Sequence, residues 1–312
     1  MMTISVIICT FNRSQLLNLV LEDLVNQTLD RKLFEVIIID NNSNDNTESL
    51  VNEFCQINDI NIVYCKEYKQ GVSHARNRGV FESKSSYIAY TDDDCRIPKN
   101  WLEKAYEIIL LMSPDVFGGP ILPIYSSEKP SWYKDEYAMV SHGNQKIFFI
   151  GNEFFSGGNM IFRKELLIKA GGFDTNVGPI GKKLGHAEED SAQIRIKKIK
   201  PDAKFYYDPE LEVTHNVSKN KISLLWPFKF GFSIGKSKEY LNQLDYPQDI
   251  KKYNFLEFFK NIVYILLTYI KEIVSDLIKR DKKRFPFIEN IIYERSFKFA
   301  RKIGVLSKKY HD

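Results

Sequence analysis

Cysteine is scarce in this 312-residue chain, and the placement of the four cysteines argues against two classes of protein. They fall in the first third of the sequence, at Cys9, Cys55, Cys65 and Cys95, and no two of them form a CxxC pair. The sequence therefore gives no sign of a disulfide framework or of a zinc site built on cysteine. Because two of them lie inside predicted strands, we expect buried free thiols in a reducing compartment.

Long apolar runs and a secretory leader are also missing. The longest uncharged stretch near the C-terminus covers residues 261–270, about half the length that a membrane-spanning helix needs. The apolar run at residues 1–10 has neither a basic start nor a small-residue cleavage site, so we expect a strand and not a signal peptide. These features predict a cytoplasmic protein without a membrane span.

Negative charge is sparse at the C-terminal end. Residues 251–312 hold 15 Lys and Arg against 7 Asp and Glu, whereas residues 1–250 hold 29 against 33. This segregation predicts a mildly acidic body and a basic tail that meets something anionic. No recognised nucleic-acid-binding fold accompanies the charge, which favours a membrane surface over nucleic acid. Richness in Lys, Ile and Asn is typical of bacterial proteins encoded by AT-rich genes.

Alternation of apolar runs and amphipathic stretches predicts the fold class of the first half. The predicted strands are residues 3–10, 35–40, 61–65 and 87–91, and the predicted helices are residues 16–26, 47–57 and 73–83. This rhythm predicts a parallel sheet with helices on both faces. In such sheets, ligands bind at the carboxyl ends of the strands.

Three consecutive aspartates, Asp92, Asp93 and Asp94, follow the predicted strand at residues 87–91. Mutually repelling carboxylates at this edge of a sheet suit a divalent cation better than they suit a structural role. The alternative is an acidic turn that caps the next helix.

Other polar residues follow the remaining strands. Those able to recognise a base or a ribose come after the first two strands: Thr10, Asn12, Arg13, Asp40 and Asn42. After the third strand, Gly71 opens a helix with Arg76 in its first turn, an arrangement suited to a diphosphate. The alternatives are helix capping for the polar residues and simple solvation for Arg76.

The second half carries three further features. The segment Gly157–Asn159 interrupts an apolar run where backbone must come close to a ligand or to another strand. The run Glu188–Asp190 opens a predicted helix, where the helix dipole alone would favour acidic residues. His215 ends a predicted strand at residues 206–215, and a lone histidine is more often structural than a ligand.

Taken together in this order, these motifs resemble the family-2 glycosyltransferases with the GT-A fold, over residues 1–240. The matching segments are residues 5–13, 38–43, 71–79, 92–94, 157–159, 189–190 and 206–215. The resemblance implies an α/β fold of the GT-A (Rossmann-like) type, a mixed sheet flanked by helices, with a C-terminal helical extension. We expect a catalytic domain at residues 1–240, divided into a nucleotide-binding half (1–115) and an acceptor-binding half (116–240), and a basic amphipathic tail at 241–312.

The resemblance also implies a chemistry. It is an inverting, metal-dependent transfer of a hexosyl-type sugar from a nucleoside diphosphate sugar, expected to be UDP-linked, to an acceptor hydroxyl, in surface polysaccharide or lipid-linked glycan synthesis. Such an enzyme needs a carboxylate base and a cation, because a hydroxyl is a weak nucleophile and a nucleoside diphosphate is a highly charged leaving group. The implied roles are the base for Asp190, with Glu189 orienting it; nucleotide-sugar binding for Thr10, Asn12, Arg13, Asp40, Asn42, Arg76, Asp92 and Asp93; the sugar and acceptor pocket for Gly157, Gly158 and Asn159; and Mg²⁺ or Mn²⁺ binding for Asp94, Asp92 and His215.

Other functions fit the strand ends less well. A dinucleotide-dependent dehydrogenase needs a glycine-rich turn after the first strand, and a sugar-nucleotide nucleotidyltransferase needs a glycine-rich basic loop there, but residues 10–15 contain no glycine. A non-catalytic sugar-nucleotide-binding or membrane scaffold protein would not need both acidic motifs.

The chain departs from the family pattern after Asp40, which is followed by two asparagines, and this leaves the contacts to the nucleotide base open. The run Glu188–Asp190 also allows the catalytic base to shift by one position.

The tail is expected to contain two helices, at residues 255–278 and 288–303, with a basic cluster at 279–284. One outcome is a helical hairpin packed on the catalytic domain, and the other is a basic amphipathic helix on an anionic membrane. Together with a lipid-linked or surface-glycan acceptor, the second outcome predicts a cytoplasmic enzyme that is peripheral on the inner face of the cell membrane.

Overall fold

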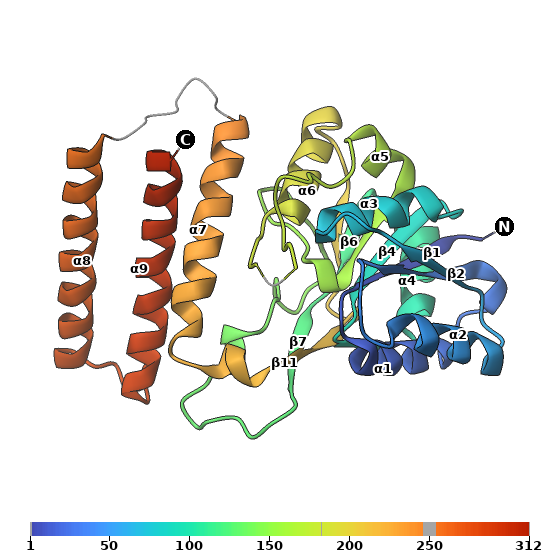
Figure 1. Cartoon of the computed structure of the whole chain (residues 1–312), viewed down its shortest axis with the longest axis horizontal. Helices are drawn as coiled ribbons and strands as arrows, with labels where there is room; N and C mark the ends of the chain where they lie inside the picture. Colours follow the sequence, from blue (N-terminus) through green and yellow to red (C-terminus); the bar gives the residue numbers. More distant parts are fainter. Residues whose placement is uncertain (1, 182, 246–253, 312) are drawn as a thin grey trace. The chain divides into compact units, whose positions relative to one another are not determined.

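The computed structural model describes residues 2–181, 183–245 and 254–311 (Figure 1). The chain forms two compact units, of which unit 1 comprises residues 1–124, 138–181 and 188–216, and unit 2 comprises residues 125–137, 182–187 and 217–312. The expected domain boundary after residue 240 falls inside a helix of unit 2. The charge boundary at residue 250 lies outside the described residues.

Unit 1 is built on a mixed eight-stranded sheet. Its strands are, in spatial order, β3 (Ile62–Lys66), β2 (Phe34–Asp40), β1 (Ile4–Thr10), β4 (Tyr87–Asp92), β9 (Met160–Arg163), β6 (Val116–Gly118), β10 (Phe205–Tyr207) and β8 (Ile147–Phe148). The first four strands are parallel, as the sequence predicts, and β9 runs antiparallel between β4 and β6. The mixed sheet of the expected fold class is therefore confirmed.

Helices cover both faces of this sheet (Figure 1). On one face, α1 (Ser14–Val25), α2 (Thr47–Ile57) and α4 (Trp101–Met112) share a core with Val36 and Ile38 of β2. On the other face, α3 (Val72–Glu82), α5 (Lys164–Lys169) and α6 (Glu188–Ile199) share a core with Ile37 and Ile39. Because successive side chains of a strand point to opposite faces, β2 is buried along its whole length.

A second, three-stranded sheet corrects one prediction. It contains β5 (Cys95–Arg96), β11 (Val213–Val217) and β7 (Ile121–Tyr125). The single strand predicted at residues 206–215 is wrong, because that segment contributes β10 to the large sheet and β11 to the small one. A turn divides them, in which the Leu211 amide donates to the Asp208 carbonyl and Pro209 lacks the N–H that a continuous ladder needs. His215 consequently lies in the middle of a strand, paired with Cys95.

The described part of unit 2 contains three long helices, α7 (Trp226–Asp245), α8 (Phe255–Ile278) and α9 (Ile288–His311). The bounds of α8 match the prediction, whereas α9 continues past residue 303. Helices α7 and α9 approach closely at Gly235, where a Cβ would lie 2.1 Å from the Arg301 carbonyl oxygen. Among the helices of the described residues, none combines the length and the hydropathy that a bilayer crossing requires.

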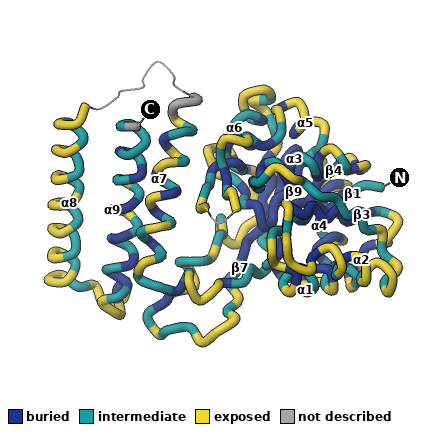
Figure 2. Tube along the Cα trace, viewed as in Figure 1, coloured by how far each residue is buried: buried dark blue, intermediate teal, exposed yellow. Residues whose placement is uncertain are grey.

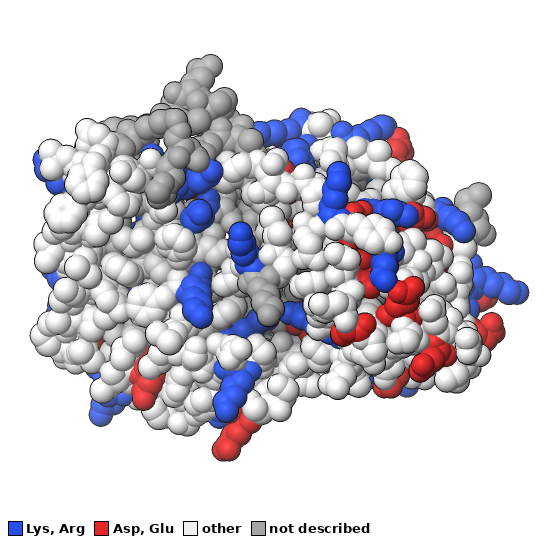
Figure 3. Space-filling view, viewed as in Figure 1, with Lys and Arg blue, Asp and Glu red and all other residues white. Residues whose placement is uncertain are grey.

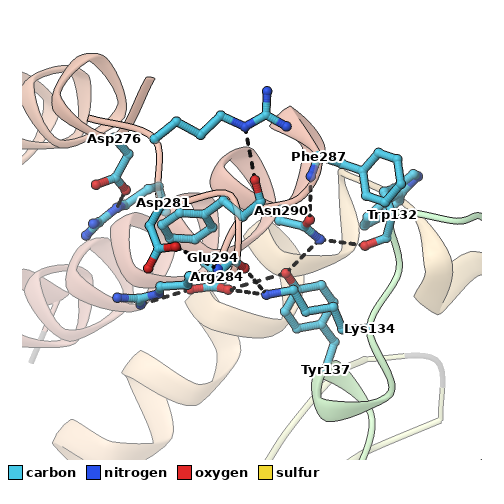
Figure 4. A network of polar contacts seen from close by, with 12 residues as sticks. Trp132, Lys134, Tyr137, Asp276, Asp281, Arg284, Phe287, Asn290 and Glu294 are labelled. Atoms are coloured by element: carbon cyan, nitrogen blue, oxygen red, sulfur yellow. Dashed lines mark hydrogen bonds and ion pairs between the residues drawn. The ribbon is translucent and has the colours of Figure 1, made fainter. Parts of the chain in front are cut away.

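A polar and aromatic network fastens residues 125–137 to α9 (Figure 4). The side-chain amide of Asn290 donates to the Trp132 carbonyl at 2.5 Å and to the Tyr137 hydroxyl at 3.1 Å. The ring of Tyr137 stacks on Tyr293, with centroids 4.3 Å apart. Unit 2 is therefore held together by segments far apart in the sequence and not by its helices alone.

Candidate active site

The carboxyl ends of three neighbouring strands bring the predicted polar residues together. Thr10 of β1 pairs with Asp40 of β2, and Cys9 of β1 pairs with Asp92 of β4. Because these strands are parallel, the segments that follow them meet at one edge of the sheet. Thr10, Asp40 and the aspartate triplet therefore lie at this edge.

Asp93 is the inward-facing member of the triplet. Its carboxylate accepts hydrogen bonds from the Thr10 hydroxyl and from Arg13, both at 2.8 Å. Burial raises the pKa of Asp93 to about 6, although the guanidinium of Arg13 opposes the shift. Arg13 also lies 3.1 Å from Asp94. Its charge therefore holds two mutually repelling carboxylates together.

Within the described residues, one cluster of side chains has the spacing of metal ligands. The ligand atoms of Asp92, Asp94 and Cys95 lie within 4.8 Å of one another. Nε2 of His215 lies 3.2 Å from a carboxylate oxygen of Asp94, so the fold brings this histidine beside the triplet. Burial raises the pKa of the Cys95 thiol well above its ordinary value, which favours oxygen and imidazole donors over a thiolate. Two carboxylates beside an imidazole form a donor set that fits a divalent cation.

The loops after β1 and β2 are tied to each other. The backbone amide of Asn12 donates to the Ser43 hydroxyl at 2.9 Å. Asn12 and Asn42 have positive φ angles of 54° and 67°, a conformation that asparagine tolerates better than most residues. Asp40 accepts hydrogen bonds from the Tyr64 hydroxyl at 2.6 Å and the Ser43 amide at 2.7 Å. The predicted nucleotide-binding residues thus stabilise the loops that carry them.

Arg76 is the fifth residue of α3, one position beyond the predicted first turn, and its side chain is buried among carboxylates. Its guanidinium lies 2.8 Å from Glu188, 3.0 Å from Glu189 and 3.9 Å from Asp92, and only 5% of the side chain is exposed. It also lies over the ring of Phe173. The sequence pattern favours a diphosphate as the partner of Arg76. In the folded chain its partners are protein carboxylates, because a buried guanidinium requires compensating charge.

Glu189 and Asp190 occupy the first turn of α6 in different surroundings. Glu189 accepts a hydrogen bond from the Gly157 amide at 2.9 Å, in addition to its contact with Arg76. Burial and the charge of Glu188 raise the pKa of Glu189 to about 7. Burial and the charge of Glu189 raise the pKa of Asp190 to about 6. Carboxyl groups that titrate near neutrality are candidates for proton transfer.

The turn Gly157–Asn159 lies against the triplet. A Cβ at Gly158 would lie 3.2 Å from a carboxylate oxygen of Asp92, so glycine allows this close approach. The side chain of Asn159 is buried, where it accepts from the Trp101 indole at 3.1 Å and donates to two backbone carbonyls. Asn159 therefore anchors the turn to the interior, and its side chain does not face the sheet edge.

Several supporting residues carry no recognisable signal in the sequence. Asn41 accepts from the Gly71 amide at 2.8 Å and so fixes the start of α3. The Tyr64 hydroxyl holds Asp40, and the Trp101 indole holds the glycine turn through Asn159. The role of Tyr64 could be predicted only from an alignment that places β3 beside β2. The expectation of buried thiols holds fully only for Cys95, because Cys9 and Cys65 are partly buried and Cys55 is exposed.

Comparison with known proteins decides the family. The sequence model described as Glycosyl transferase family 2 matches residues 5–171, more than half of the chain. The chain belongs to glycosyl transferase family 2. The resemblance predicted from the strand-end motifs is thereby confirmed, while Glu189, Asp190 and His215 lie beyond the matched segment.

At least one relative of this glycosyltransferase family 2 chain matches more of it than that segment. A glucosyl-dolichyl phosphate glucuronosyltransferase of Haloferax volcanii is 25% identical over 285 residues, covering 88% of each chain. A GalNAc(5)-diNAcBac-PP-undecaprenol beta-1,3-glucosyltransferase of Campylobacter jejuni is 30% identical over 169 residues, covering 53% of this chain and 52% of the relative.

Solved structures share the fold. The mannosyltransferase PcManGT from Pyrobaculum calidifontis, in complex with GDP-Man and Mn²⁺, has a TM-score of 0.58 at 19% identity and covers 77% of this chain and 64% of its own. Residues 1–349 of S. aureus TarS, in complex with UDP, have a TM-score of 0.55 at 16% identity and cover 97% of this chain and 90% of their own. The GT-A architecture of the family is therefore present here.

Proposed function

We propose that the protein transfers a hexosyl sugar from a UDP-linked donor to an acceptor hydroxyl, with inversion at the anomeric carbon. One observation carries the proposal: the Arg76 guanidinium lies 3.0 Å from Glu189 and 3.9 Å from Asp92. A single buried cation thus ties the acidic start of α6 to the aspartate triplet. Inverting transfer needs these two functions in one site, because a base must deprotonate the acceptor while the diphosphate departs.

In this proposal Asp190 is the general base. A carboxyl group with a pKa of about 6 is ionised at neutral pH and still has appreciable affinity for a proton. Glu189 is engaged by Arg76 and Gly157, which suits it to orienting the base and the acceptor. Gly157, with Gly158, would border the donor sugar.

On the donor side, Asp94, Asp92 and His215 would hold Mg²⁺ or Mn²⁺. The bound cation would neutralise charge on the diphosphate leaving group. The remaining nucleotide contacts would come from the strand-end residues Thr10, Asn12, Arg13, Asp40, Asn42 and Asp93. This assignment is supported by neighbours of the same fold that were solved with GDP-Man and Mn²⁺ or with UDP.

We extend the proposal to the acceptor, which would be a lipid-linked glycan or a surface polysaccharide, modified at the inner face of a bacterial cell membrane. Two relatives support this class, since one is named for action on a glucosyl-dolichyl phosphate and the other for action on an undecaprenol-linked glycan. A purely soluble acceptor would leave the basic tail unexplained.

A donor panel tests the transfer. Purified full-length protein is incubated with UDP-, GDP- and dTDP-sugars and with undecaprenyl- or dolichyl-linked sugars, in Mn²⁺, Mg²⁺ or chelator. We expect nucleotide release from a UDP-sugar that chelator abolishes, and NMR should show an inverted anomeric configuration in the product. Release from no donor with either cation would overturn the transfer, and a retained configuration would overturn inversion.

A further inference from the structure

Helices α8 and α9 form an antiparallel hairpin in which one face of α8 is covered (Figure 1). The ring of Tyr269 lies 4.7 Å from that of Phe299 on α9, and Phe258 stacks on Tyr310 with centroids 4.4 Å apart. None of the 24 residues of α8 is fully buried, and Figure 2 shows much of the helix exposed. The face turned away from α9 has no cover among the described residues.

That uncovered surface, here called the outer face of α8, is apolar. Its large side chains recur every three or four residues and are between 39% and 77% exposed: Phe259, Val263, Leu267, Ile270, Val274 and Ile278. They form a stripe roughly 30 Å long. A continuous exposed apolar stripe of this length marks an interaction surface, because monomeric proteins rarely leave one in water.

The charges of α8 are sorted between its two faces. Glu272 and Asp276 both accept hydrogen bonds from Arg295 of α9 at 2.6 Å, and Glu257 closes the capping box at the start of the helix. All residues of α8 are described, and the charged ones that are exposed are Lys260 and Lys271. The outer face is therefore apolar and cationic, with its carboxylates turned toward α9 or used in the cap.

Basic residues continue where α8 ends. Lys279, Lys282 and Lys283 are exposed in the connection to α9. Figure 3 shows Lys and Arg scattered among uncharged atoms over the C-terminal helices, with few Asp or Glu on that face. An apolar stripe edged by lysines matches a lipid boundary, where acyl chains receive the apolar side chains and the lysine stems extend to the phosphates.

We propose that the outer face of α8 docks on an anionic lipid surface, with the helix lying parallel to the membrane plane. The lysines select anionic headgroups, and the apolar stripe enters the boundary between headgroups and acyl chains. Charge also favours lipid over a second copy of this chain. Two outer faces packed together would enclose Lys260 and Lys271 from both copies without a carboxylate on either face.

Sedimentation with vesicles tests the docking on the full chain. The vesicles are phosphatidylcholine alone or with about a third phosphatidylglycerol. The test variant is Leu267→Glu/Ile270→Glu. The matched control is Leu110→Glu/Leu111→Glu, which adds the same charge to another pair of exposed aliphatic residues, on α4. We expect wild type and control to bind anionic vesicles at least about tenfold more tightly than the α8 variant and than neutral vesicles.

A second variant guards against misfolding of the first. Lys260→Gln/Lys271→Gln keeps the apolar stripe and should weaken binding to anionic vesicles by about tenfold while leaving the residual binding less sensitive to salt. Wild-type protein that ignores anionic vesicles, or an α8 variant that binds like the control, would overturn the docking. The docking would also be overturned if the wild type does not bind vesicles but forms a dimer that the α8 substitutions dissociate. Donor hydrolysis without vesicles should be equal in all variants, which separates this test from that of the proposed transfer.

Discussion

The buried guanidinium of Arg76 forms an ion pair 3.0 Å long with the partly buried Glu189, although the two residues are 113 positions apart in the chain. The same guanidinium lies 2.8 Å from Glu188, so two neighbouring carboxylates of α6 share one cation. The pair links α3 to the helix that carries Asp190. In a poorly hydrated environment, removing the cation would leave both carboxylates without compensation.

Replacing Arg76 by leucine should therefore destabilise the protein by on the order of 3–5 kcal/mol. Arg78→Leu is the matched control, because Arg78 lies on the same helix and pairs with Glu82 at the surface, a contact worth about 1 kcal/mol or less. Urea unfolding of both variants measures the difference. Equal losses of stability would mean that the buried pair contributes no more than the surface pair.

Asp190→Asn should separate turnover from binding. If Asp190 is the base, the amide preserves shape but cannot accept the proton, so turnover should fall by about 10² to 10⁴-fold with donor affinity retained. Glu189→Gln and Glu188→Gln, made alongside, detect a base displaced by one or two positions. Single-turnover transfer and donor titration give the two quantities. Activity of Asp190→Asn within about threefold of wild type would end the assignment.

The same substitution should change stability in a pH-dependent way. The pKa of Asp190 is raised from 3.8 to about 6, so the folded protein holds this proton more tightly than the unfolded chain. The wild type therefore loses stability as pH rises from about 4 to about 6. At pH 7, Asp190→Asn should be more stable than wild type by on the order of 1 kcal/mol. Near pH 4, the two proteins should have similar stability. Thermal melts across this range measure the gap. A constant difference in stability at all pH values would contradict the raised pKa of Asp190.

The same pKa also predicts the pH dependence of activity: kcat/KM of the wild type should rise as pH increases through about 6.

Metal-dependent nucleotide binding should depend more on Asp94 than on Asp92. The side chain of Asp94 is 9% exposed and lies beside His215, whereas that of Asp92 is 42% exposed. Asp94→Asn should therefore abolish most of the thermal stabilisation by Mn²⁺ with UDP, and Asp92→Asn should reduce it less. Melting with and without chelator measures both. Nucleotide-induced shifts in Tm that chelator leaves unchanged in the wild type would refute a metal requirement.

Gly157→Ala should lower both stability and turnover. The added Cβ would lie 2.1 Å from the Glu189 carboxylate and 2.2 Å from the Arg76 guanidinium, and overpacking of this kind costs about 1–3 kcal/mol. Gly151→Ala is the control, because a Cβ there first meets the side chain of Glu153, at 3.0 Å. Unfolding and transfer assays compare the two variants. Equal stability and equal turnover in the two variants would show that the close contact of Gly157 with Glu189 is not required for folding or for transfer.

Local sequence was enough to predict the repeating elements of unit 1. The four parallel strands and α2 begin and end within about one residue of prediction, because their apolar patterns report burial over a few neighbouring positions. The same pattern gave the bounds of α8. Helix α7 is different. Its first half contains Pro227, Gly231 and Gly235, which weaken helix propensity, and its close packing on α9 is what favours the helix there.

The partners of the polar side chains depend on the folded chain. Locally, Arg76 fits a diphosphate as well as it fits carboxylates, and the fold supplies Glu188 and Glu189 from more than a hundred residues away. The pattern of α8 predicts an amphipathic helix but cannot tell which face α9 covers and which stays exposed. Backbone hydrogen bonding and helical periodicity act over a few residues, so the sequence reports them directly. Distant segments must come within a few ångströms to form ion pairs, to pair the strand that holds His215, or to bury one face of a helix. Such contacts exist only in the tertiary structure.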